Sequence, residues 1–139
     1  MTFNLDELVA KAHELIEDAE PELVPVSLAR RQVGVRFVPM SGEDWHELTL
    51  KHPPRPEVRR DLNVGYNITG VVSAYPHVAI VNGDEVDDLI RVDAEGKTYS
   101  KWPAVFAALT STGRKDVESA IWDAHERTPE RLVEDAGKD

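Results

Sequence analysis

Histidine and carboxylate side chains are the groups in this chain with the chemistry to bind a metal or move a proton. The five histidines lie at positions 13, 46, 52, 77 and 125, and no two are four residues apart, the spacing of a helical metal site. A calcium loop alternates its oxygen ligands around a central glycine. Here Gly83 precedes the acidic cluster, so we expect a solvated turn formed by Asp84, Glu85, Asp87 and Asp88.

Catalytic nucleophiles and cofactor motifs are missing as well. The chain has no cysteine, which excludes disulfides, thiolate metal sites and a cysteine nucleophile. It has neither a Gly-x-Ser-x-Gly elbow nor a glycine-rich phosphate loop. Its carboxylate pairs lie in charged segments, where nothing raises a pKa toward that of a general acid. The sequence therefore predicts a non-enzyme with no catalytic residue, no metal and no cofactor.

The composition predicts one globular domain over residues 1–139. Sixteen basic residues against 26 acidic ones give a net charge of −10, which argues against nucleic acid as a partner. The acidity serves either solubility or the attraction of a basic partner. Residues 1–20 are acidic and periodic, and no apolar run is long enough to cross a bilayer, so we expect neither a secretion signal nor a membrane partner.

Helical spacing of apolar residues opens the chain and predicts a helix over residues 5–19, capped by Asn4. The stripe consists of Leu5, Leu8, Val9, Ala12, Leu15, Ile16 and Ala19. Such a stripe packs into a core or forms the seam of a dimer. We expect core packing, with a homo-oligomer as the alternative.

Two valine-rich runs predict an antiparallel hairpin over residues 23–39. Val33, Val35 and Phe37 alternate with other residues, which is the period of a half-buried strand. Arg30-Arg31 lies between the two runs and is not a preferred two-residue turn, so a longer loop is expected.

The segment 42–75 predicts two helices around a proline-rich elbow. A capping box at 41–44 starts the first helix, and the prolines from Pro53 to Pro56 end it. Residues 78–81 read as a strand, and residues 101–136 predict C-terminal helices with apolar stripes. The predicted fold class is α+β: a mainly helical single domain with a small N-terminal antiparallel β-hairpin.

The elbow offers a shaped surface for binding another protein. Prolines hold a surface in shape without an entropy loss on binding, and Trp, Tyr and Arg are frequent interface anchors. In the alternative interpretation, the prolines only turn the chain and Tyr66-Asn67 only caps a helix. The predicted partner-binding residues are Trp45, His52, Pro53, Pro54, Arg55, Tyr66 and Asn67.

The chain from Pro25 to Trp122 resembles small proteins encoded in the tail-gene clusters of long-tailed actinobacterial phages, which are similar to tail assembly chaperones. The most specific part runs from Trp45 to Asn67. The segments that carry the resemblance are PVSL at 25–28, SGEDW at 41–45, KHPPR at 51–55, GYN at 65–67, YPHVAIVNGD at 75–84 and AIW at 120–122.

The resemblance implies a protein made in the cytoplasm of the infected bacterial host. It implies binding to the tape measure protein during tail assembly and help in recruiting the tail tube subunit. Such chaperones often have a longer form made by ribosomal frameshifting, which would act here near Gly137-Lys138. Two alternatives are a structural head–tail joining or tail-completion protein of the virion, and a generic dimeric adaptor.

Overall fold

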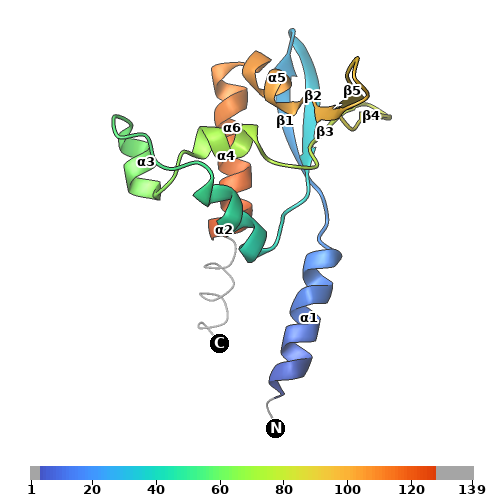
Figure 1. Ribbon diagram of the computed structural model, residues 1–139. Coiled ribbons are helices and arrows are strands. Elements are labelled where there is room, and N and C mark those ends of the chain that lie inside the picture. Colours follow the sequence, from blue (N-terminus) through green and yellow to red (C-terminus); the bar gives the residue numbers. More distant parts are fainter. Residues whose placement is uncertain (1–3, 128–139) are drawn as a thin grey trace.

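The computed structural model describes residues 4–127 and shows a mixed α/β fold, so the prediction of a mainly helical domain was wrong (Figure 1). A four-stranded antiparallel sheet has the order β1-β2-β3-β4, and β5 pairs with β6 in a second sheet. The predicted hairpin is part of the larger sheet because β2 also pairs with β3, a strand that lies far away in the sequence. The strands are β1 (Glu22–Leu28), β2 (Arg31–Phe37), β3 (Ala79–Asn82), β4 (Glu85–Asp87), β5 (Ile90–Val92) and β6 (Thr98–Ser100).

The turn between β1 and β2 is tighter than the sequence predicted. Leu28 pairs with Arg31, which leaves only Ala29 and Arg30 to reverse the chain. Their φ angles are 51° and 65°, as a two-residue turn with both central residues in the left-handed region requires. The expected longer loop was wrong because strand twist favours this turn, even without the Asn-Gly pair that usually forms it.

Replacing Ala29 by Asn and Arg30 by Gly should stabilise the protein. Both new residues tolerate the left-handed region, in which other residues cost about 1–2 kcal/mol each. We expect urea unfolding to show a gain of about 1 kcal/mol. Gln32→Gly, a control within strand β2, should lose stability instead. A double variant no more stable than the wild type would contradict a strained turn.

The helices within the described residues are short, and none is long and apolar enough to span a membrane. The predicted second helix of segment 42–75 is two helices, since Gly65 (φ 99°) ends one and Asn67 caps the next. Of the predicted region 101–136, residues 128–136 lie outside the described residues, as does Gly137-Lys138. The helices are α1 (Leu5–Glu17), α2 (Gly42–Leu50), α3 (Arg59–Val64), α4 (Ile68–Ser73), α5 (Trp102–Ala108), α6 (Ser111–Trp122) and the π-helical turn η1 (Asp123–Arg127).

The core lies on one face of the four-stranded sheet, where α6 packs on β1 and on α4. The burial predicted for Val33, Val35 and Phe37 is confirmed, but Gly34 between them is buried as well because the Leu23 side chain lies against it. Helix α5 adds Trp102, whose Nε1 donates a hydrogen bond to the carbonyl oxygen of Val72 at 2.7 Å. Other core side chains include Val24, Val26, Val71, Val72, Phe106, Val117 and Ile121.

Helix α1 lies outside this core, so the expectation of core packing was wrong. No residue of α1 is buried, and the helix extends away from the rest of the chain (Figure 1). The apolar stripe was read correctly, since the hydrophobic spacing does form a helix capped by Asn4. The spacing of a stripe does not determine what covers it. In this fold α6 already packs on β1 and on α4.

The contrast between the core and α1 predicts very different costs for two truncations. Phe106 is 2% exposed, so Phe106→Ala should cost about 3–5 kcal/mol of unfolding free energy. Leu8 is 53% exposed, and Leu8→Ala should change it by only a few tenths of a kcal/mol. Urea denaturation of both variants measures the difference. Equal losses would mean that α1 packs in the core after all.

Candidate functional site

The predicted binding surface is built on the ends of α2 and α4, on either side of the elbow. The side chain of Asn67 accepts a hydrogen bond from the backbone N–H of Gly70 at 3.1 Å, which caps α4. The backbone N–H of Asn67 donates to the carbonyl oxygen of His52 at 2.9 Å. The His52 ring lies so close to Gly70 that a Cβ there would approach Nδ1 to 2.8 Å. His52 and Asn67 therefore join the end of α2 to the start of α4.

Arg55 closes the elbow by binding a buried carboxylate. The Asp61 side chain is 0% exposed and accepts from the backbone N–H of Arg55 at 3.0 Å, from Nε at 2.8 Å and from Nη2 at 3.2 Å. These hydrogen bonds hold the pKa of Asp61 below its usual value. The Arg55 side chain is itself 44% exposed, so it supports the loop and still faces solvent.

The two aromatic members of the predicted surface point into the fold. Trp45 and Tyr66 are 5% and 8% exposed, and their rings meet edge to face with centroids 6.0 Å apart. Both donate to one carboxylate oxygen of Glu126, Trp45 through Nε1 at 2.7 Å and Tyr66 through its hydroxyl at 3.2 Å. In this arrangement they hold the turn η1 that follows α6, while Pro53 and Arg55 stay exposed. Partner binding by the predicted set stays a prediction.

His125 lies beside this carboxylate and joins three parts of the fold. Its Nδ1 donates to the carbonyl oxygen of Ile121 at 2.7 Å, and its Nε2 accepts from the backbone N–H of Met40 at 3.0 Å. The ring stacks on Trp45 with centroids 4.2 Å apart. This pattern requires the neutral ring, and burial lowers the pKa of His125.

The sequence pattern did not predict that His125 and Glu126 act together. One signal was available, since His125 follows Ile121 by four residues on an apolar stripe. No such signal was available for Glu126, because the π-helical turn η1 changes the helical period at the point where this residue turns toward the fold.

Acid should weaken the fold through His125. The imidazole has its ordinary pKa of 6.5 when unfolded, and the pKa is lowered when folded. The neutral ring contributes stability that is complete above pH 6.5 and is lost as the pH falls through the lowered folded-state value. Between about pH 7 and about pH 5, unfolding free energy from urea titration should fall more steeply in the wild type than in His125→Gln.

The control for this experiment is His46→Gln, because His46 is exposed on α2. Its pH dependence should match that of the wild type. The comparison uses the slopes with pH, since His125→Gln also loses the stacking on Trp45 and is less stable at every pH. Equal slopes for the wild type and His125→Gln would contradict the neutral, buried ring.

The apolar face of α1 is a second candidate surface, and it is exposed to solvent. Helical geometry places its apolar residues within about a third of the helix circumference. The acidic residues Asp6, Glu7, Glu14 and Glu17 lie on the opposite side of the helix, and Lys11 and His13 lie beside the apolar face. The large apolar side chains on this face are between 42% and 63% exposed: Leu5, Leu8, Val9, Leu15 and Ile16.

A shallow groove of about 320 Å³ lies between α3, α4 and α6. Val64, Ile68 and Trp122 supply its apolar lining. Its rim carries an ion pair at 3.3 Å between Arg60 and Glu118. The Arg60 charge is thus already used within the fold, and the groove has room for a small apolar side chain.

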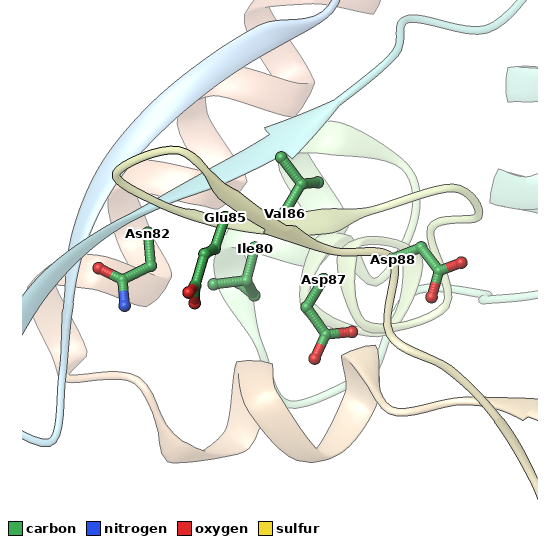
Figure 2. A pocket seen from close by; sticks show the side chains of 6 residues that line it. All are labelled: Ile80, Asn82, Glu85, Val86, Asp87 and Asp88. Atoms are coloured by element: carbon green, nitrogen blue, oxygen red, sulfur yellow. The ribbon is translucent and has the colours of Figure 1, made fainter.

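Three members of the acidic cluster, Glu85, Asp87 and Asp88, line an open recess along β4 (Figure 2). The carboxylates of these three residues are spread along the chain instead of converging on one point (Figure 2). Asp87 is engaged by Arg91, whose Nη2 lies 2.7 Å away, and that ion pair lowers the pKa of Asp87 to about 2. Within residues 4–127, no three His, Asp or Glu side chains are placed to hold a metal ion.

Comparisons with protein families, with curated proteins and with solved structures gave no match for this chain. The surfaces are therefore interpreted from their own geometry. Two of them combine exposure with side chains suited to a protein partner: the elbow around Pro53 and Arg55, and the apolar face of α1.

Proposed function

We propose that the protein is a non-enzymatic phage tail assembly chaperone that binds the tape measure protein in the cytoplasm of the infected host. The main support for a binding function is the exposure of α1, a 13-residue amphipathic helix with no buried residue. The resemblance over residues 25–122 supplies the identity of the partner and the recruitment of the tail tube subunit.

An uncovered amphipathic helix supports a binding role on energetic grounds. Isolated helices shorter than about 12–15 residues are marginal in water, and most helices are stabilised by packing their apolar face. Helix α1 has the apolar face but no packing within residues 4–127. A partner that covers Leu8 and Leu15 would supply it. Tape measure proteins are long and helical, so a contact between helices suits both chains.

Capture of the candidate tape measure protein tests the proposal. We expect the tagged wild-type protein to retain it on co-expression, and a Leu8→Gln, Leu15→Gln variant to lose most of the capture. Gln has nearly the helix propensity of Leu, so the substitutions remove apolar surface without removing the helix. Leu62→Gln is the matched control, since Leu62 is 57% exposed on α3.

The same assay examines the elbow through Pro53→Glu. Pro53 is exposed, whereas Arg55→Glu would leave the buried Asp61 without its partner and weaken the fold. Loss of capture by Pro53→Glu alone would place the binding surface at the elbow. Absence of capture by the wild type, together with the protein in purified virions, would reject the chaperone in favour of a structural virion component.

A further inference from the structure

The four-stranded sheet carries a row of apolar residues on its outer face, the face opposite the core. Residues paired across strands point to the same face, and neighbours along a strand alternate between faces. Because Val35 faces the core, the adjacent Gly34 faces outward. The register continues this outward position across all four strands, from Pro25 through Gly34 and Val81 to Val86. A sheet face in contact with water usually carries polar residues instead.

Much of this outer face is exposed to solvent in the structure of residues 4–127. Val86 is 50% exposed. Leu23, which also points outward because it pairs with Arg36, is 58% exposed. Helix α6 packs on the other face of the sheet, in the core. The outer face is therefore a second apolar surface, besides that of α1, that the described chain leaves uncovered.

The outer face also differs from the rest of this acidic chain in its charge. The three acidic residues of the four strands are Glu22, Glu85 and Asp87, and their pairing partners place all of them on the core side. Arg36 is the only charged residue of these strands that points outward. In a chain with a net charge of −10, another copy meets the least repulsion where no carboxylate is presented.

We infer that two copies of the chain form a twofold dimer in which α1 of each copy docks its apolar face on the outer sheet face of the other. Both surfaces are uncovered in the same chain, and α1 extends away from its own sheet (Figure 1). A twofold arrangement covers both surfaces of both copies at once. Glu7 and Glu14 lie on the side of α1 opposite its apolar face, so they would stay in solvent.

The size of the contact favours a symmetric pair over a single docking event. Helix α1 has 13 residues, so it is about 20 Å long and about 10 Å wide. One docked helix covers roughly 200 Å² in projection, or roughly 400 Å² over the two surfaces. That is small for a specific interface, whereas two symmetric contacts bring it to roughly 800 Å² in projection. Accessible area exceeds projected area because side chains interlock, so the pair reaches the size of a weak specific dimer.

The inference rests on the exposure of α1, as the proposed function does, and deepens that function by adding a resting state. In the dimer, α1 is covered by a second copy, and the tape measure protein must displace that copy to bind the same apolar face. The outer sheet face is needed for the dimer only, so variants of it separate the two contacts.

Chemical cross-linking tests which surfaces meet. The chain has no cysteine, so an introduced thiol is unique. Leu8→Cys on α1 and Val86→Cys on the sheet are purified separately, and both replace exposed residues. A short bis-maleimide should join them into a dimer when the two variants are mixed, and neither variant should cross-link efficiently alone. A mixture of Leu8→Cys with Leu62→Cys is the matched control, since Leu62 is equally exposed on α3 and should give no product.

Sedimentation of the full-length protein at increasing concentration measures the dimer itself. Leu23→Thr with Val86→Thr removes apolar area from the sheet face and keeps residues that favour strands. We expect this variant, and Leu8→Gln with Leu15→Gln, each to raise the dimer dissociation constant at least about tenfold. Leu62→Gln should leave it within about twofold of the wild type.

The competing arrangements give different results, and each would overturn the inference. Cross-linking of Leu8→Cys alone would make the contact a pair of α1 helices, and cross-linking of Val86→Cys alone would make it a pair of sheets. A monomeric Leu8→Cys, Val86→Cys variant that cross-links within one chain would mean that α1 folds back on its own sheet. A dimer that fails to capture the tape measure protein rejects only the proposed function. Capture by a wild type that is monomeric at every concentration rejects only this inference.

Discussion

The pairing of β2 with β3 is the constraint on which the rest of the fold depends. It sets Val35 beside Ile80 and Arg36 beside Ala79, so the whole segment between the two strands must leave the sheet and return to it. That segment contains α2, the elbow, α3 and α4. When the segment returns to the sheet it places β3 beside β2, and β4 then pairs with the other edge of β3. Long-range pairing of this kind makes the sheet more than a local hairpin.

The returning segment is held by polar contacts as well as by apolar packing. Asp61 fixes the elbow through Arg55, and Glu126 ties the turn η1 to Trp45 and Tyr66. In the part of the chain that the structure describes, no fully buried side-chain nitrogen or oxygen lacks a hydrogen-bond partner. Trp45 and Tyr66 are residue types that often anchor interfaces, yet here they are buried inside the fold. Trp and Tyr combine a large apolar area with a hydrogen-bond donor that needs a partner when it is buried.

Helix α1 contrasts with this closed arrangement. The core elements pack their apolar side chains against one another, whereas no residue of α1 is buried within the described part of the chain. An uncovered amphipathic helix beside a packed core suits the proposed role of binding another chain.

The sequence by itself determined the features that depend on neighbouring residues. The caps at Asn4, Ser41 and Asn67, the alternation in β2 and the stripe of α1 all follow from local spacing and local hydrogen bonds. The candidate surfaces were partly predictable in the same way, since the elbow and the stripe are both visible in the sequence.

Only the tertiary structure decided how these elements are used. The β2–β3 pairing, the burial of Trp45 and Tyr66, and the exposure of α1 depend on contacts between residues far apart in the chain. The physical reason is that residue spacing fixes which face of an element is apolar. What covers that face is settled by which other surfaces are already paired.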